Sequence, residues 1–199
     1  MKVESTRPYR MQARAEAAEE TANSILRAAT IAFESTRFAD VTLRRIADAA
    51  EVSVQTVIRR FGSKKGLFDA VVDRERTRVA AQREVPDGAD LHHRIEILVD
   101  HYEEDGDVVL HLLSEADRSP EIALVVAEGR RTHRTWVETH LPEVFASARG
   151  AERRQLVDAA VAATDLFTWK LLRRDVGRNT MEVVAVMVRI LEGLREEKP

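Results

Sequence analysis

The residues whose types and spacing could recognise a ligand chemically are concentrated in residues 42–65, which read TLRRIADAAEVSVQTVIRRFGSKK. This stretch predicts two short helices, over residues 43–50 and 54–61, joined by a turn of a few residues, which is the layout of a helix-turn-helix. Thr42 and Ser53 stand directly before the two helices, where a hydroxyl oxygen accepts a hydrogen bond from a free amide of the first turn. The pattern predicts a helix pair that positions the side chains of its second member.

The second of these helices carries side chains suited to the edges of base pairs. With Val57 and Phe61 turned toward a core, Gln55 and Ile58 face outward. A glutamine pairs bidentately with adenine, and an outward isoleucine suits the thymine methyl group in a major groove. Residues 53–65 also contain four cations and no acid, although most such runs are solvated faces. The expected core positions are Ile46, Val52, Val57 and Phe61, and the expected outward positions are Val54, Gln55, Ile58 and Arg59.

The positions of glycine and proline along the chain predict an all-α fold. Only eight glycines and five prolines interrupt it, and the stretches between them have helix rather than strand length. Ile25, Ala29 and Phe33 form one apolar stripe on the first helix, and Asn179 is a candidate N-cap for the last. The expected helices cover residues 19–34, 43–50, 54–61, 64–83, 91–104, 107–117, 121–141, 152–174 and 179–195.

Composition and charge narrow the class of protein. The 199 residues include 44% hydrophobic and 33% charged residues, as in a folded soluble protein. The absence of cysteine excludes disulfide frameworks and thiolate zinc sites, and no cofactor or metal site is predicted. No apolar run exceeds six residues, and the first residues lack the apolar block of a signal peptide. A cytoplasmic protein without membrane contact is therefore expected. Residues 1–85 hold 16 Lys and Arg against 12 Asp and Glu, while residues 86–199 hold 15 against 22, which suggests that the first part meets a polyanion.

Residues 19–72 resemble the DNA-binding domain of the TetR family of bacterial transcription regulators. The family pattern is a helix ending in an aromatic residue, followed by T-x-x-x-I-A-x-x-A-G-V-S-x-x-T-x-Y-x-x-F-x-S-K-x-x-L. The matching residues are Phe33, Thr42, Ile46, Ala47, Ala50, Val52, Ser53, Thr56, Phe61, Ser63, Lys64 and Leu67. The resemblance implies an N-terminal three-helix helix-turn-helix DNA-binding domain, followed by a C-terminal helical ligand-binding and dimerisation domain. The expected divisions are a flexible basic arm over residues 1–18, a DNA-binding domain over 19–66 and a regulatory and dimerisation domain over 67–199.

The resemblance also assigns roles to residues. Val54, Gln55 and Ile58 fall at base-reading positions, and Arg44 at a position that reaches bases or backbone. Two residues depart from the family pattern: Glu51 stands where glycine is usual, in a turn that needs positive φ, and Ile58 replaces a tyrosine that touches DNA. Phosphate contacts are implied for Thr42, Thr56, Arg59, Arg60 and Lys64.

A second copy of the chain is an expected partner, because one such motif contributes too little for tight specific binding. Two copies related by a two-fold axis would reach successive major grooves of a palindromic operator, ~34–36 Å apart. The last two helices carry apolar stripes that suit a four-helix dimer bundle, or the core of the subunit alone. The predicted interface residues are Leu156, Ala160, Phe167, Leu171, Val184, Met187 and Leu191.

The C-terminal part is expected to bind a small-molecule effector. Binding of the effector would release the homodimer from its operator, and the protein would then be an inducible repressor. Candidate contacts are Tyr102, His133, Trp136 and Phe167, since apolar walls with few polar groups are typical of such pockets, although aromatic residues at helical spacing are more often plain core. An enzyme is not expected, because no nucleophile elbow or metalloprotease motif is present. The remaining alternative is a helical small-molecule-binding or adaptor protein without sequence-specific DNA binding.

Overall fold

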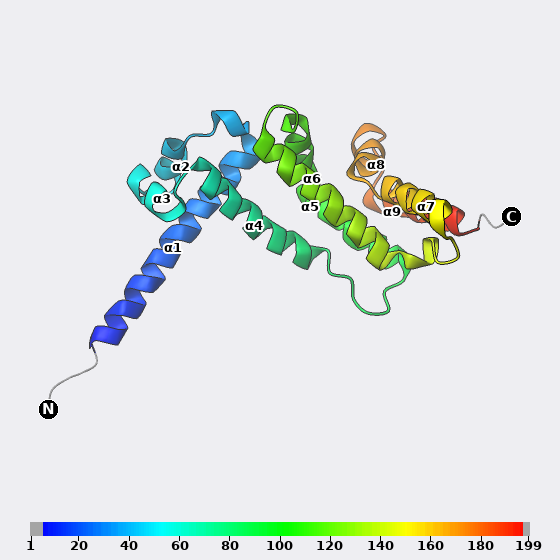
Figure 1. Cartoon of the computed structure of the whole chain (residues 1–199), viewed down its shortest axis with the longest axis horizontal. Helices are drawn as coiled ribbons and strands as arrows, with labels where there is room; N and C mark the ends of the chain where they lie inside the picture. Colours follow the sequence, from blue (N-terminus) through cyan, green and yellow to red (C-terminus); the bar gives the residue numbers. More distant parts are fainter. Residues whose placement is uncertain (1–5, 197–199) are drawn as a thin grey trace. The chain divides into compact units, whose positions relative to one another are not determined.

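The computed structural model describes residues 6–196, and it confirms the all-α prediction: no strand occurs within this range (Figure 1). The chain packs as two compact units, of which the first ends at Arg76 and the second begins at Thr77. The expected domain boundary after residue 66 precedes this division. Each unit has a core of its own.

The first unit is built on a cluster of three phenylalanine rings. Phe68 packs edge-to-face against Phe33 and Phe38, with 5.0 Å between ring centroids in both pairs. Ile25 and Ala29 of the predicted stripe are fully buried as well, so the 3.6-residue spacing of apolar side chains correctly predicted the buried face of this helix. The elements of this unit are α1 (Thr6–Ser35), η1 (Phe38–Asp40), α2 (Leu43–Ala49), α3 (Val54–Phe61) and α4 (Lys64–Gln82), of which α4 continues into the second unit.

The first helix begins earlier than the sequence pattern predicted. Residues 6–18, expected as a flexible arm, belong to α1, and residues 1–5 of that expected arm lie outside the described residues. The side chains of residues 11–20 are all exposed, and the Gln12 amide donates to Glu16 over 3.1 Å. Four alanines between residues 13 and 18 favour helix without any burial. A prediction based on an apolar stripe therefore started the helix too late.

Glu51 adopts the left-handed conformation that the turn between α2 and α3 requires. Its φ is 55°, and it is the single non-glycine residue with positive φ in the described part of the chain. A side chain with a Cβ atom is strained in this region, while glycine is not. The chain therefore makes its helix-turn-helix at a conformational cost located at Glu51.

Replacing Glu51 by glycine is expected to stabilise the first unit by about 1 kcal/mol, because the strain at positive φ is removed. Amide hydrogen exchange of residues 43–61 measures the change. Ala49→Gly, on exposed helical backbone two residues earlier, is the matched control and is expected to cost about 1 kcal/mol. Equal effects of the two glycines would contradict the argument.

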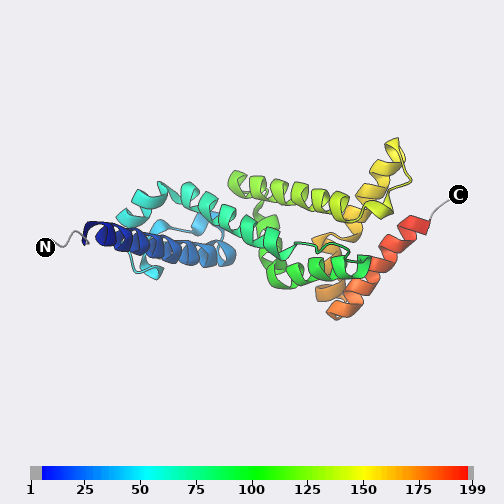
Figure 2. The same cartoon turned by 90° about the horizontal axis from the view of Figure 1, so that it is seen from below.

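The second unit is a bundle in which α5 packs against α6 and α9, and α7 against both α6 and α9 (Figures 1 and 2). Its core contains fully buried side chains from all of these helices, including Leu98, Val137, Val157, Trp169 and Met187. The predicted cap of the last helix is confirmed, because Asn179 accepts from the Glu182 amide and Glu182 accepts from the Asn179 amide. The elements are α5 (Leu91–Glu115), α6 (Pro120–His140), η2 (Pro142–Val144), α7 (Gly150–Ala163), α8 (Leu166–Lys170), a π-helical turn η3 (Leu171–Asp175) and α9 (Thr180–Glu196).

Gly106 does not end a helix, contrary to the predicted break between residues 104 and 107. It lies inside α5, and a Cβ atom built on it would come within 2.6 Å of the Trp169 ring. The glycine is needed for close packing of α5 against α8, which a single-helix pattern cannot reveal. The predicted single helix over residues 152–174 is also wrong. It is interrupted at buried Thr164, and Asp165 caps α8 by accepting from the Phe167 amide.

Gly106→Ala is expected to destabilise the second unit, because the added methyl group meets a fully buried indole. Overpacking of this kind costs about 1–3 kcal/mol, which exceeds the ~1 kcal/mol that alanine gains in a helix. Both tryptophans of the chain belong to this unit, so their fluorescence during urea unfolding measures the effect. Gly129→Ala, on α6 with no atom within 4 Å of the built Cβ, is the control and is expected to stabilise. A stabilising Gly106→Ala would refute the packing role.

Candidate nucleic-acid interface

Side-chain caps hold α2 and α3 at the expected starting residues. The Thr42 hydroxyl accepts from the Arg45 amide over 3.3 Å, and the Ser53 hydroxyl accepts from the Thr56 amide over 3.1 Å. The Thr56 hydroxyl lies 2.9 Å from that of Ser53. Both predicted N-caps are confirmed. The hydroxyls of Thr42 and Thr56, predicted to hold phosphates, thus each have a partner inside the domain, and their contact with DNA stays a prediction.

The outward face of α3 is polar and cationic, with one apolar side chain. Val57 is fully buried, while Gln55, Arg59 and Arg60 are exposed and Ile58 is 40% exposed. Val54 is half-buried beside them. Neither Arg59 nor Arg60 forms an ion pair within residues 6–196. The helix therefore presents a hydrogen-bonding amide, a branched apolar group and two uncompensated cations to solvent.

The two lysines that follow are engaged within the domain. The Lys64 ammonium donates to the backbone carbonyls of Phe38, Ala39 and Val41 over 2.8, 3.3 and 3.1 Å, and it lies 4.6 Å from the Phe38 ring centroid. Its three protons are thus used to tie the loop before α2 to the start of α4. The phosphate contact predicted for Lys64 gains no support from this geometry. Lys65 forms an ion pair with Asp69 at 2.7 Å.

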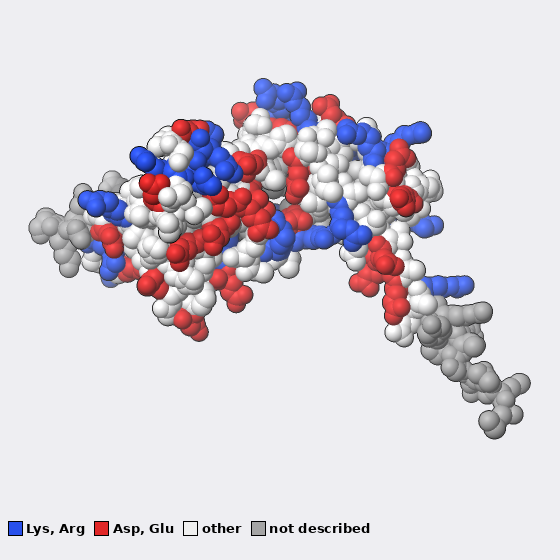
Figure 3. Space-filling view, turned by 180° about the vertical axis from the view of Figure 1, so that it is seen from behind, with Lys and Arg blue, Asp and Glu red and all other residues white. Residues whose placement is uncertain are grey.

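On α2, Arg44 is almost fully exposed and stands 3.9 Å from Asp48 one turn later. An exposed pair at that distance contributes little and is easily exchanged for another partner. Acidic and basic side chains are intermixed over the face drawn in Figure 3. Positive charge is therefore not a property of the whole surface, and the uncompensated cations of α3 are a local feature.

Three of the four predicted effector contacts lie in the buried interior of the second unit. The Tyr102 hydroxyl donates to the Thr164 carbonyl over 2.9 Å, and the Thr164 hydroxyl lies 3.2 Å from His133 Nε2. The same Thr164 hydroxyl donates to the Ala160 carbonyl, so it accepts from His133. His133 is therefore neutral with its proton on Nε2. Its other nitrogen, Nδ1, accepts from Arg83 over 3.3 Å.

Arg83 is the residue of this network that sequence reasoning missed. It is 8% exposed, its guanidinium lies 5.2 Å from the Trp136 ring centroid, and its carbonyl accepts from the Trp136 indole. Nothing in the polar stretch around it distinguishes it from a surface arginine. Burial and then the Arg83 charge lower the pKa of His133 to about 4. Burial also raises the pKa of Tyr102 and lowers that of Arg83.

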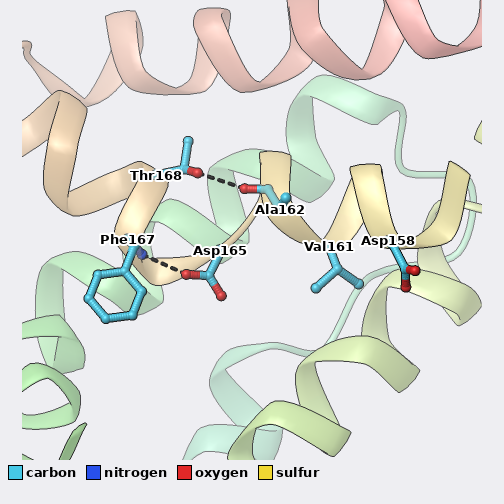
Figure 4. A pocket seen from close by; sticks show the side chains of 6 residues that line it. All are labelled: Asp158, Val161, Ala162, Asp165, Phe167 and Thr168. Carbon is cyan, nitrogen blue, oxygen red and sulfur yellow. Dashed lines mark hydrogen bonds between the residues drawn. The ribbon is translucent and has the colours of Figure 1, made fainter. Parts of the chain in front are cut away.

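Phe167, the fourth predicted contact, lies on a different feature. Its ring is 55% exposed and lines a hollow of about 510 Å³ at the α7–α8 corner, with Asp158, Val161, Ala162, Asp165 and Thr168 (Figure 4). The two carboxylates are already engaged, because Asp158 pairs with Arg134 at 2.6 Å and Asp165 caps α8. The structure therefore does not place Phe167 with Tyr102, His133 and Trp136.

The predicted dimer residues divide into two groups. Ala160, Val184, Met187 and Leu191 are buried in the core of the second unit, and their place in an interface stays a prediction. The apolar stripe of α9 packs against α5 and α7. The sequence pattern alone does not distinguish a stripe that packs in the core from one that forms a dimer interface. Leu156 is half-buried, while Phe167 and Leu171 are exposed.

Comparison with known proteins assigns the fold to a family. Residues 25–71, from within α1 to within α4, match the model of the bacterial regulatory proteins of the TetR family. This segment is a DNA-binding domain of the TetR family. The match supports a DNA-binding regulator of transcription. The matched segment includes the whole helix-turn-helix with its capped α2 and α3.

Solved structures of other proteins, among them TetR-family transcriptional regulators, have this fold over most of the chain. A regulator from Streptomyces coelicolor is 20% identical, with a TM-score of 0.68 over 88% of this chain and 80% of its own. One from Rhodococcus sp. is 15% identical, with a TM-score of 0.67 over 89% and 100%. GusR of Salmonella enterica is 21% identical, with a TM-score of 0.59 over 89% and 96%. At these identities the likeness shows the fold alone. No curated protein matches the chain.

Two further observations concern metal binding and membrane crossing. Within residues 6–196, no group of three His, Asp or Glu side chains is arranged to hold a metal ion. In the same part of the chain, no helix combines the length and the apolar character that crossing a membrane requires.

Proposed function

We propose that this protein is a homodimeric repressor that binds a palindromic operator through α3 and is released by a small-molecule effector. The observation that carries the proposal is the outward face of α3. There Gln55 and Ile58 stand beside Arg59 and Arg60, two arginines without ion-pair partners in the described chain. Base contacts by Gln55 and Ile58 specify sequence, and the arginines hold phosphates that set the register.

Dimerisation is supported by apolar side chains that the second unit leaves exposed near the end of the chain. Phe167 and Leu171 are 55% and 54% exposed. An apolar surface made by α8 and η3 suits a second copy of the same surface across a two-fold axis. Two copies of α3 would then reach successive major grooves.

Control by an effector is supported by the polar network inside the second unit. A buried assembly of Arg83, His133, Thr164 and Tyr102 against the Trp136 ring is unusual in a structural core, because each polar group must be compensated. Arg83 directly follows α4, the helix that begins two residues after α3. A ligand that changes the position of Arg83 would act on α4 by chain continuity and alter the DNA-bound state.

Selection of bound duplexes from random fragments tests operator binding, and Gln55→Ala tests the base-reading role. The variant is expected to relax selectivity at one base pair of each half-site, at a cost of about 1–3 kcal/mol there. Gln155→Ala, an exposed glutamine on α7, is the matched control and is expected to leave the selected sequence unchanged. A selection without a palindrome would contradict the dimeric mode, and an unchanged Gln55→Ala profile would remove Gln55 from the reading set.

A further inference from the structure

Arg83 is a buried cation without a counter-ion. Its side chain is 8% exposed, and no carboxylate pairs with it within residues 6–196. Nη2 contacts His133, while Nε is buried and makes no hydrogen bond. An uncompensated buried charge is costly, and the neutral His133 and the Trp136 ring supply only an acceptor and a π-face. The site therefore holds one positive charge more than its own residues balance.

The acids of this region already have partners. Asp105 is held by Arg78 at 2.5 Å and by His101 at 3.1 Å, and Glu104 accepts from Gln82 over 2.5 Å. The neighbouring cation Arg94 pairs with Glu143 at 3.0 Å. Arg94 and Arg83 both contribute to lowering the pKa of His140, after burial. The positive potential of Arg83 therefore extends beyond His133, and no carboxylate within residues 6–196 pairs with Arg83.

We infer that the effector is a small organic acid whose carboxylate binds the Arg83 guanidinium. This inference rests on the proposed effector-controlled function. A planar carboxylate matches the guanidinium fork through charge-assisted hydrogen bonds. A single negative charge balances the single unpaired cation, whereas a phosphate dianion would leave a buried charge of opposite sign. The Trp136 ring, 5.2 Å from the guanidinium, is the aromatic neighbour of the apolar part of the acid.

Thermal unfolding of the full chain, followed by tryptophan fluorescence, tests the inference without DNA. The probes are benzoate and hexanoate, each paired with its own carboxamide, and inorganic phosphate. At millimolar concentration the carboxylates are expected to raise the Tm, while the carboxamides and phosphate leave it unchanged. Arg83→Gln is expected to weaken carboxylate binding roughly tenfold to a hundredfold. Arg130→Gln, an exposed arginine on α6, should respond as the wild type does.

Arg83→Met separates a ligand site from a structural arginine. Removing an uncompensated buried cation is expected to raise the Tm of the free protein and to abolish the carboxylate response. A lowered Tm with a retained response would overturn the inference. So would equal shifts with acids and amides, a shift with phosphate equal to that with the acids, or no shift with either acid. These wild-type comparisons decide the matter even if a variant at residue 83 does not fold.

The same samples examined in a DNA mobility-shift assay separate this inference from the proposed function. Carboxylate binding that releases bound DNA supports both. Carboxylate binding by a chain that binds no duplex contradicts the proposed repressor and leaves the acid site supported. DNA binding by a chain whose Tm no acid raises supports the DNA-binding proposal and overturns the acid site.

Discussion

Replacing Arg59 and Arg60 together by alanine is expected to weaken binding to every duplex, specific or random. Each arginine that neutralises a phosphate contributes about −0.9 to the slope of log K against log salt. Two such arginines in each of two subunits give four contacts, so the slope should become less steep by about 3.6. The side chains are exposed and have no ion pairs in the described chain, so the fold should be unaffected.

The matched control for this pair is Arg130→Ala with Arg131→Ala. These two adjacent arginines are exposed on α6 in the second unit, where Arg131 pairs with Glu128. Fluorescence anisotropy of a labelled duplex over a range of salt concentrations gives the slopes. The control should retain the wild-type slope. An unchanged slope in the α3 variant would show that the two cations do not meet phosphates, and it would remove the observation on which the proposed function rests.

Lowering the pH from 7 to 5 is expected to destabilise the second unit by about 2 kcal/mol through His133 alone. Burial and the Arg83 charge hold the pKa of His133 at about 4, against 6.5 for an ordinary histidine. Between these values the unfolded chain binds a proton that the folded chain does not, so stability falls as the pH falls from about 6.5 to about 4. The full linkage is about 3 kcal/mol at the lower end of this range.

His140 and Asp105 also make the folded protein less stable as the pH falls, each in its own pH range. The pKa of His140 is lowered by burial and by Arg94 and Arg83. Burial alone would raise the pKa of Asp105, but hydrogen bonds from His101 and Arg78 outweigh it and lower the value. The stability that Asp105 contributes is therefore lost only as the pH falls through and below about 3.8, its ordinary pKa.

His133→Gln isolates the contribution of His133, because it removes the titrating group and retains a side chain able to donate and accept. Urea unfolding at pH 7 and pH 5, followed by tryptophan fluorescence, should show a smaller pH dependence in this variant than in the wild type. His92→Gln, at an exposed position of α5, should keep the wild-type dependence. If His133→Gln keeps the wild-type dependence as well, His133 is not the neutral buried acceptor that the network requires.

Much of the first unit follows from local sequence. The bounds of α3 are those predicted, since Ser53 caps its start and Gly62, with φ of 76°, ends it. The strained turn at Glu51 was also predicted, because a missing glycine in a family pattern is visible in the residues themselves. Capping, turn chemistry and apolar spacing act over a few residues, and the outward exposure of Gln55 follows from them.

The second unit shows where such reasoning fails. Gly106 resembles a helix break until Trp169, distant in sequence, is placed against it. The apolar stripe of α9 is equally suited to a subunit core and a dimer interface, and only packing assigned Met187 to the core. Arg83 resembles a surface cation until His133 and Trp136 of α6 pack against it. The sequence by itself determined the capped helices α2 and α3 and the outward side chains of α3, because those depend on neighbours along the chain. Tertiary structure decided which charges are buried and which apolar faces are occupied, because those depend on residues that meet only after folding.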